Sequence, residues 1–495
     1  MKPKNIFLLV ILVIVSTTLM AQNDATNLQN QEMQTFDTYH DVDYNQNLRP
    51  QFHFSSLKGW LNDPNGMVWY DGEYHLYFQH NPKDVKWGNM TWGHAVSQDM
   101  VHWEQLPHAI LPYGGGTIFS GTAVVDHKNF LGKQNRNNKT LVAYFSFAKE
   151  PFYQAAAYST DKGRTFSLVN NGGSVVPNQG FDKSERDPKV FWHEESQKWL
   201  MILWVLRGKK EGSSKQKLGK VRFFTSENMV NWELASDFNR TWVYECMDFV
   251  ELPVDGDINN KKWLLYDASF DYEIGDFNGK VFTTDKKVYK GDLGTNFYAA
   301  QTFNNSPDDR TVMIGWMRFP GDSSPFLKAK APFNQCMSFP TTMELKTTKD
   351  GIRLYRWPVK EIANLYVKSY EFKNLSAEKA VKKLAGINAE LLDLSIEFEP
   401  ISSMTINLRG LDISYEKSSQ TITFGKSKLA APAIDGKVKL RVLLDRATIE
   451  LFANEGAAVS TNYALPLEDN LNISISAEGN LKINSLIVNE LKSSW

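Results

Sequence analysis

The sequence predicts an all-β protein: a five-bladed β-propeller followed by a C-terminal antiparallel β-sandwich. Three observations support this prediction. A segment with a hydroxyl, an acid, a turn and an aromatic residue returns roughly every 60 residues in the first part of the chain. Of the 14 Trp, 12 lie before residue 317. Beyond residue 362, apolar and polar residues alternate with period two, as in a sandwich. A length of 495 residues fits two domains.

The first 48 residues precede both predicted domains. Lys2 and Lys4 are followed by an apolar run, residues 6–15, and by small residues up to Ala21. This order is typical of a secretory signal peptide over residues 1–21, which predicts an exported protein, periplasmic or secreted. An uncleaved N-terminal anchor is the alternative. Residues 22–48 are rich in Asn, Gln, Asp and Thr, and we expect them to form a flexible lead-in.

The propeller is predicted for residues 49–350. The recurring segment begins at Ser97, Ser159, Ser226 and Thr284, with spacings of 62, 67 and 58 residues. Such a period is what the radial blades of a propeller produce, and this length of chain holds about five of them. The stretch MVWYDGEYHLYFQH contains two apolar runs around Asp-Gly, which predicts a hairpin inside one blade.

After LYRWPVKEI, Trp becomes rare and apolar and polar residues alternate regularly. We expect residues 351–362 to form a linker and residues 363–495 to form the sandwich. All nine His lie at or before His193, and no acid constellation marks the C-terminal part. Any chemistry is therefore expected in the first domain.

Charge and motif content exclude several classes of function. The formal net charge is −1, so neither nucleic acid nor, after signal cleavage, a membrane is expected as a partner. No His-x-x-x-His or Cys-x-x-Cys spacing and no nucleotide-binding glycine motif occurs, so neither a metal nor a cofactor is expected. Two cysteines, Cys246 and Cys336, cannot form a disulfide framework, and the sequence leaves open whether they pair. The oligomeric state is also left open.

Three acids stand in similar settings just before apolar runs: Asp63 in WLNDPNG, Asp187 in SERDPKVFW and Glu245 in VYECMDFVEL. Their separations, 124 and 58 residues, are close to two blade periods and one. Equivalent positions in successive blades converge on the propeller axis, so this spacing predicts three carboxyl groups in one funnel. Arg186 is the expected counter-charge. Each acid alone is more simply a turn or cap residue, but the shared spacing favours a functional interpretation.

A funnel of this kind suits glycoside hydrolysis, which needs one protonated and one ionised carboxyl group. Glu245 has apolar neighbours in the sequence, so we expect its side chain to be the protonated partner. Asp63 lies beside the Asn62 amide and a predicted turn, where we expect it to stay ionised.

These residues carry a resemblance to a known family. WLNDPNG, RDPKVFW and YECMDF resemble, in order and spacing, the three signature motifs of glycoside hydrolase family 32, the β-fructosidases, which include invertases, levanases and inulinases. The segments YFQHNP, FSGTAVVD, YAAQTF and LLDRATIELFANEGAAVSTN agree with it. The similarity extends from about residue 49 to 490.

The resemblance implies a five-bladed propeller with a β-sandwich, and hydrolysis of β-D-fructofuranosides in fructans or sucrose with retention. By motif position it implies that Asp63 is the nucleophile, Glu245 the general acid and base, and Asp187 the stabiliser of the transition state. It further implies exo action at a terminal fructose. The implied substrate-binding residues are Asn62, Gln79, Trp87, Phe119, Ser120, Arg186 and Trp316.

The sequence departs from the family pattern at two places. Met247 replaces the usual Pro or Val after the motif cysteine, which puts the acid's environment and the pH optimum in question. The segment over residues 267–279 looks like a shortened loop beside the pocket, which puts the leaving-group preference in question.

Two other functions remain alternatives at this point: an inverting, arabinanase-like propeller enzyme, and a non-catalytic carbohydrate-binding propeller. The first would lack these three motifs, and the second would have no need of an acid/base pair. The preference among levan, inulin and sucrose is left open, because all three present the same terminal fructose.

Overall fold

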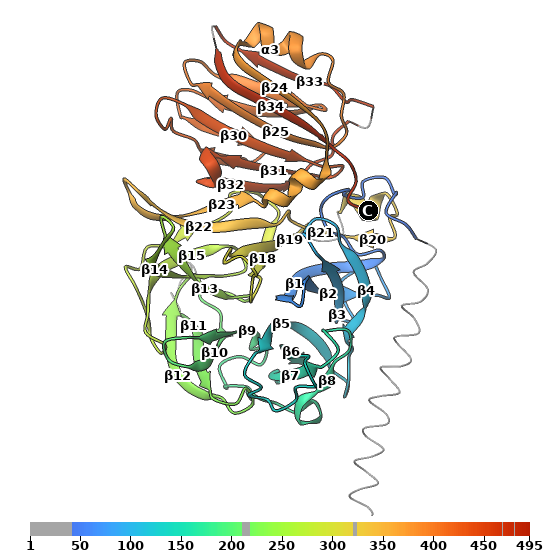
Figure 1. The fold of residues 1–495 in the computed structure, drawn as a ribbon, viewed down its shortest axis with the longest axis vertical. Coiled ribbons are helices and arrows are strands. Elements are labelled where there is room, and N and C mark those ends of the chain that lie inside the picture. The colour runs from blue at the N-terminus through green and yellow to red at the C-terminus, as the bar shows by residue number, and fades with distance from the viewer. Residues whose placement is uncertain (1–41, 210–217, 320–323, 468, 480) are drawn as a thin grey trace, which may run out of the picture.

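The computed structural model describes residues 42–209, 218–319, 324–467, 469–479 and 481–495. Figure 1 shows β-strands in two groups: blue-to-yellow strands around a common centre, and orange-to-red strands of the C-terminal part at one end. The predicted all-β class is confirmed, with few helices among the described residues. The predicted signal peptide, residues 1–21, lies outside the described residues.

The first three blades are separate sheets, antiparallel except for one short parallel pairing in the first. Each sheet follows the chain, because short turns join consecutive antiparallel strands. The first contains β1 (Gly59–Tyr70), β2 (Glu73–Asn81), β3 (Thr91–Ser97) and β4 (Glu104–Ile110), with β20 (Phe333–Asn334) added in parallel beside β1. The second contains β5 (Thr117–Asp126), β6 (Thr140–Ala148), β7 (Tyr153–Ser159) and β8 (Ser167–Leu168). The third contains β9 (Arg186–His193), β10 (Lys198–Leu206), β11 (Gly219–Ser226) and β12 (Glu233–Arg240).

The remaining propeller strands share one ten-stranded sheet. Its first group contains β13 (Asp248–Val254), β14 (Asp257–Tyr266), β15 (Asp271–Phe277), β16 (Phe282–Thr284) and β17 (Tyr289–Lys290). Its second group contains β18 (Phe297–Thr302), β19 (Val312–Met317), β21 (Cys336–Met337), β22 (Thr341–Thr348) and β23 (Gly351–Pro358). The two groups meet where β13 pairs in parallel with β22. This grouping is consistent with five blades.

The recurring segment of the sequence has a structural counterpart. Ser97, Ser159 and Ser226 end β3, β7 and β11, the third strand of their sheets, and each hydroxyl accepts a hydrogen bond from the backbone N–H two residues later. Such local hydroxyl-to-backbone bonds stop a strand and start a turn. Thr284 instead ends β16, the fourth strand of its group. The repeat therefore marks the same blade position three times and a shifted position once.

Two antiparallel sheets form the sandwich. One contains β24 (Tyr366–Ser376), β34 (Lys482–Leu491), β25 (Leu392–Glu399), β30 (Val438–Leu444), β31 (Thr448–Ala453) and β32 (Ala458–Tyr463). The other contains β29 (Ser427–Ala430), β28 (Thr421–Phe424), β27 (Leu411–Glu416), β26 (Met404–Leu408) and β33 (Ile473–Ala477). Helix α3 (Ala377–Leu384) packs on this core, and a short helix, α2 (Pro325–Lys328), lies in the propeller part.

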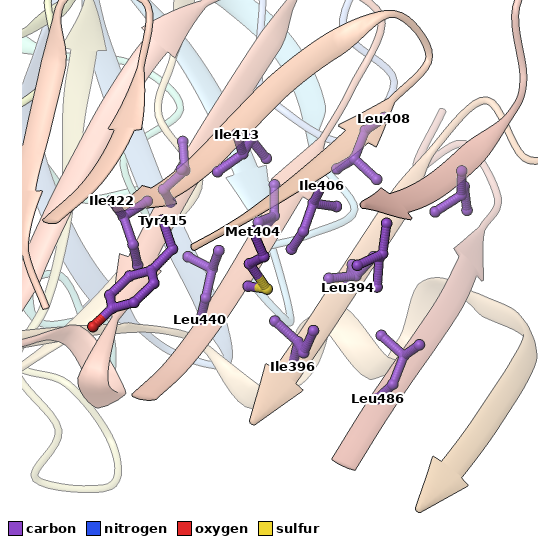
Figure 2. Packing of buried hydrophobic residues seen from close by; sticks show 14 of the residues in the cluster. Leu394, Ile396, Met404, Ile406, Leu408, Ile413, Tyr415, Ile422, Leu440 and Leu486 are labelled. Atoms are coloured by element: carbon purple, nitrogen blue, oxygen red, sulfur yellow. The ribbon is translucent and has the colours of Figure 1, made fainter. Parts of the chain in front are cut away.

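The sandwich core follows directly from the period-two alternation. Met404, Ile406 and Leu408 on β26 are buried, and Thr405 and Asn407 between them are partly exposed. Figure 2 shows these side chains meeting Leu394 and Ile396 of the facing sheet. Alternate residues of a strand point to opposite faces, so each strand contributes one apolar face to the space between the sheets.

The structure differs from the predictions for two connecting segments. Most of the predicted linker, residues 351–362, is strand β23, which pairs with β22 along its whole length; a 3-10 helix (Lys360–Leu365) then leads to β24. Most of the predicted loop 267–279 is strand β15. Of the predicted flexible lead-in, residues 22–48, the structure describes only residues 42–48; within these, Tyr44 stacks on Trp495 with ring centroids 3.7 Å apart. Strands β23 and β15 each pair with the strand just before them in the chain, so both are parts of hairpins, whereas the contact of Tyr44 with Trp495 is long-range.

Candidate active site

Asp63 reaches the propeller axis because β1 is irregular. Asn62 and Asp63 fall in a gap of the β1–β2 register between Leu61 and Pro64, and such bulges re-aim side chains beside active sites. Asp63 is therefore part of a strand, which corrects the prediction that a turn carries it.

Ser120 lies in a matching gap of β5, and its hydroxyl donates to Asp63 Oδ2 at 2.6 Å. Gly121 beside it must be glycine, since a Cβ there would lie 1.9 Å from the Tyr144 carbonyl oxygen. The bulge of β5 thus brings a hydroxyl of the second blade onto the carboxylate of the first.

Asp187 and Cys246 meet beneath Asp63. Both have a positive φ, 66° and 47°, a conformation that is strained for side chains other than Gly and that recurs at functional sites. The Cys246 N–H donates to Asp187 Oδ2 at 2.9 Å. Its sulfur lies 3.4 Å from that oxygen and 3.5 Å from Asp63 Oδ2. One thiol therefore separates two carboxylates.

The question of a disulfide is also answered by this position. Both cysteines are free and buried. Cys336 lies against Met317 and the Tyr463 hydroxyl, away from the two carboxylates.

Glu245 precedes β13 and lies in a polar setting. Arg186 donates to Glu245 Oε2 from Nη2 at 2.5 Å and from Nε at 3.2 Å. The Tyr298 hydroxyl donates to Oε1 at 2.6 Å. The expectation of an apolar environment for this carboxyl group is wrong, because Val243 and Met247 point into the core while the carboxyl group faces Arg186.

Asp63, Asp187, Glu245 and Arg186 are called here the funnel cluster. Burial raises the pKa of Asp187 to about 7; Arg186, 3.7 Å away, opposes this, and the charges of Glu245 and Asp63 add to it. Burial also raises the pKa of Asp63, against the hydrogen bond from Ser120 and with the charge of Glu245. Three acids with one guanidinium retain a proton more readily than separate carboxyl groups. The pKa of Asp63 is thus shifted upward, although the adjacent Asn62 amide was expected to favour the ionised form.

The other predicted binding residues surround this cluster. Asn62 is buried, and its Oδ1 accepts from Trp60 Nε1 at 2.8 Å. Trp316 packs edge-on against Trp60, with centroids 5.9 Å apart, and against Tyr298 at 6.0 Å. Gln79 is buried on β2. With the Asn65 side-chain amide oriented so that its oxygen faces Gln79, the Gln79 amide donates a hydrogen bond to that oxygen.

Two predicted aromatic residues form the rim. Trp87 is 59% exposed, and its ring meets that of Phe119 at 6.0 Å in a T-shaped contact. Phe119 precedes Ser120 in the same bulge, so its ring lies next to the carboxylate site. The rim is therefore apolar where the interior of the funnel is charged.

Sequence reasoning missed two residues of the site. Tyr298 lies in YAAQTF, a segment noted for its resemblance only, and Cys246 was considered as an apolar neighbour of Glu245 and as a disulfide partner, not as a contact of the carboxylates. The position of Cys246 directly after Glu245 was the available signal. The turn 267–270 also supports the site, because the Ala268 N–H donates to the Glu245 carbonyl oxygen at 3.0 Å.

No group of three or more His, Cys, Asp or Glu that could hold a metal occurs in the part of the chain that the structure describes. The arrangement offers carboxyl groups as nucleophile, acid and base, together with polar groups for hydroxyls.

The comparisons with known proteins agree with this geometry. The family model described as "Glycosyl hydrolases family 32 N-terminal domain" matches residues 53–358, and "Glycosyl hydrolases family 32 C terminal" matches residues 361–490. The chain belongs to glycoside hydrolase family 32. The predicted class of O-glycosyl hydrolase is confirmed by this membership, and the arabinanase-like and non-catalytic alternatives are set aside.

Relatives within family 32 are similar over most of the chain. A levanase of Bacillus subtilis (strain 168) is 36% identical over 509 residues, covering 92% of this chain and 72% of the relative. An extracellular exo-inulinase of Aspergillus awamori is 31% identical, covering 88% and 93%. Invertase 2 of Saccharomyces cerevisiae is 30% identical, covering 84% and 88%.

Solved structures show the same fold. The crystal structure of the exo-inulinase from Aspergillus awamori has a TM-score of 0.80 at 28% identity, covering 92% of this chain and 100% of that chain. A fructofuranosidase from Schwanniomyces occidentalis complexed with fructose has a TM-score of 0.76 at 27% identity, covering 91% and 100%.

Proposed function

We propose that this family 32 enzyme is a β-fructofuranosidase that releases terminal fructose from fructans and sucrose with retention, through a covalent fructosyl-enzyme. The observation that carries the proposal is the funnel cluster, in which three carboxyl groups and Arg186 converge from three different blades. A retaining glycosidase needs a nucleophilic carboxylate and a second carboxyl group that acts first as acid and then as base.

Asp63 is proposed as the nucleophile. Ser120 and Cys246 both contact its Oδ2, which fixes the orientation of the carboxylate toward the funnel. A fixed carboxylate attacks the anomeric carbon of fructose more readily than a mobile one, because its orientational entropy is already lost.

Glu245 is proposed as the acid and base. Arg186 contacts both Glu245 and Asp187, so the guanidinium has a counter-charge whether Glu245 holds a proton or not. Glu245 can therefore give its proton to the leaving oxygen and later take one from water without leaving Arg186 unpaired.

Asp187 is proposed to hold the fructose hydroxyls, with Asn62, Gln79 and Arg186 as further hydrogen-bonding groups. Trp87, Phe119 and Trp316 are proposed as apolar walls, because aromatic faces pack well on sugar rings. Ser120 is proposed to act through Asp63, to which it donates.

The protein is proposed to be exported, with residues 1–21 as its signal peptide. The exo-inulinases among its relatives are named extracellular. No helix within the described part of the chain is long and apolar enough to cross a membrane. Fructan and sucrose are the proposed partners.

Incubation with levan, inulin and sucrose, followed by chromatography of the products, tests the proposal. Free fructose should be the sole early product from either polymer. Early di- to tetrasaccharides would contradict exo action, and an absence of hydrolysis of all three substrates would contradict the β-fructofuranosidase function.

A further inference from the structure

A loop before β9 presents an aromatic ring that the proposed reaction does not use. Phe181 is 39% exposed, although aromatic residues of this size are usually buried. The Arg222 guanidinium lies 4.7 Å from its ring centroid and the Lys220 ammonium lies 5.1 Å from it. Asp237 pairs with both cations, at 3.0 Å and 2.6 Å. The ring is thus held against β11 while part of it stays open to solvent.

A buried carboxylate fixes the backbone of this loop. Glu185 is fully buried, and its Oε1 accepts from the Phe181 N–H at 2.8 Å. The N–H groups of Gln179 and Asp182 also donate to this carboxylate, at 2.5 Å and 3.3 Å. A buried carboxylate is costly, and these bonds offset that cost only while residues 179–182 keep their shape. The exposed ring is therefore preorganised.

The loop is continuous with the active site. Arg186 Nη1, on the side chain that holds Glu245, donates to the Ser184 carbonyl oxygen at 2.7 Å. The Phe152 N–H donates to the Lys183 carbonyl oxygen at 2.8 Å. The Phe152 ring meets that of Phe119 at 5.4 Å in a T-shaped contact. Aromatic side chains thus lead from the carboxylate site across the second blade to the loop that carries Phe181.

We propose that Phe181 stacks on a sugar unit of the fructan chain beyond the bond that is cleaved, and so determines preference for polymer over sucrose. This inference rests on the proposed function. The funnel holds the terminal fructose, and the rest of a polymer must leave over the surface around it. The loop of Phe181 is hydrogen-bonded to Arg186 and to Phe152 at that surface, so its fixed ring offers an apolar face to the sugar. Sucrose ends after one further ring, so it does not need this contact. Glu185 is the positioning residue for Phe181.

The test is steady-state kinetics of Phe181→Ala on levan, inulin and sucrose. An aromatic contact contributes roughly 0.5–1.5 kcal/mol, so kcat/KM on a polymer should fall roughly 3- to 10-fold through a higher KM. On sucrose it should stay within about twofold, and Phe181→Tyr should keep the polymer activity. Leu234→Ala is the matched control, because Leu234 is 53% exposed on β12 of the same sheet. Equal losses on polymer and sucrose, or no loss on either polymer, would overturn the proposal.

A binding measurement removes the dependence on turnover. Calorimetry should show that Asp63→Ala binds levan or inulin more tightly than the double variant Asp63→Ala/Phe181→Ala, by the factor expected above for kcat/KM. Both variants should bind fructose with equal affinity. If the two variants had equal affinity for levan and also equal affinity for inulin, the inference would be contradicted. Failure of the unmodified enzyme to hydrolyse any of the three substrates would instead contradict the proposed function, so the two failures are distinguishable.

Glu185 has its own test. Glu185→Ala should reproduce the rise in KM for polymer with kcat on sucrose unchanged, and Glu185→Gln should restore part of the loss, because its remaining carbonyl oxygen still accepts from the loop. An equal fall of kcat on sucrose would refute the positioning role, since the substitution would then act through the adjacent Arg186.

Discussion

The funnel cluster and the contact between propeller and sandwich both contain buried charges, but they are built in opposite ways. His53, Asp445 and Glu450, called here the interface cluster, are all fully buried. The His53 ring bonds to Asp445 at 2.9 Å and to Glu450 at 3.3 Å. Further donors satisfy the carboxylate oxygens: the N–H groups of Gln51, Phe52, Phe339 and Arg446 and the Thr461 hydroxyl.

The difference lies in how completely the negative charge is satisfied. In the interface cluster every carboxylate accepts several hydrogen bonds, as a structural ion pair requires to offset desolvation. In the funnel cluster Asp187 and Glu245 share one guanidinium, Asp63 has no ion pair among the described residues, and Asp187 and Cys246 have strained backbones. A site that is left short of partners is available to a substrate, whereas a satisfied site contributes only to the fold.

The largest expected effect is on chemistry in the funnel cluster. Asp63→Ala removes the covalent route for every substrate, so kcat should fall on the order of 10⁴- to 10⁶-fold. Glu245→Ala should lose roughly 10²–10⁴-fold on sucrose, whose leaving oxygen needs a proton. An aryl fructofuranoside, whose leaving group departs unprotonated, should still form the fructosyl-enzyme in Glu245→Ala.

Pre-steady-state kinetics on that aryl substrate distinguishes the two roles. Glu245→Ala should show a burst followed by slow turnover, and azide should accelerate the second step because it needs no base. Asp63→Ala should show neither. A burst in Asp63→Ala and none in Glu245→Ala would reverse the proposed roles.

The next effect concerns stability in the interface cluster. Asp445→Ala leaves His53 and several N–H groups buried without their acceptor, so the free energy of unfolding should fall by about 3–5 kcal/mol. Asp276→Ala is the control: its ion pair with Lys262 is exposed, and its loss should cost less than about 1 kcal/mol. Urea unfolding of both variants measures this, and equal costs would show that the interface cluster is not a stabilising element.

The two clusters should also respond to pH at different places. Burial lowers the pKa of His53, but its bonds to Asp445 and Glu450 outweigh this and raise the pKa to about 9. Because this folded pKa lies above the ordinary 6.5, the contribution to stability is complete below pH 6.5 and is lost as the pH rises through 9. The proton of the funnel cluster is lost earlier, around the pKa of Asp187 at about 7.

Because Asp187 is proposed to hold the fructose hydroxyls as a carboxylate, activity should rise as the pH increases through about 7, in a protein that stays folded until the pH approaches 9. Parallel profiles of kcat/KM and of the thermal midpoint test this expectation. A kcat/KM that falls or stays constant as the pH rises through 7 would contradict it.

The comparison also explains what the sequence can predict. Asp63, Asp187 and Glu245 were identifiable because blade spacing and family motifs are properties of the chain itself. The surroundings of Glu245 were not, because apolar neighbours in sequence pack into the core while Arg186 and Tyr298 arrive from other blades. The alternation of apolar and polar residues likewise predicted the sandwich, because buried and exposed positions alternate along its strands.

What could not be predicted depends on pairing between distant segments. Strand β23 is the exception: it pairs with β22, from which only two residues separate it, so the linker prediction missed a local hairpin. The interface cluster joins His53 to Asp445 across nearly the whole chain, and no local pattern marks either residue. Glu185 resembles any loop acid until its N–H donors are seen.

The smallest expected effect is a change in the free energy of unfolding when an Asp is replaced by Asn, and this change should have opposite signs in the two clusters. Because the pKa of Asp187 is raised in the folded protein, its ionised form lowers the free energy of unfolding. The stabilisation by the protonated form is complete below the ordinary pKa of 3.8 and is lost as the pH rises through about 7. Asp187→Asn imitates the protonated form, and an amide oxygen can still accept from the Cys246 N–H. We therefore expect activity to be lost while the free energy of unfolding rises by about 1 kcal/mol at pH 7 or above.

Asp445→Asn should do the reverse and destabilise the protein, because its new NH₂ group would face N–H donors on both sides. Urea unfolding at pH 5 and pH 8 tests the pair of substitutions. The gain from Asp187→Asn should shrink at pH 5, where the carboxyl group of the parent enzyme is already protonated, whereas the cost of Asp445→Asn should persist. If the free energy of unfolding rose in both variants, the carboxylates of the interface cluster would lack hydrogen-bond partners as those of the funnel cluster do. If it fell in both variants, Asp187 would stabilise the fold.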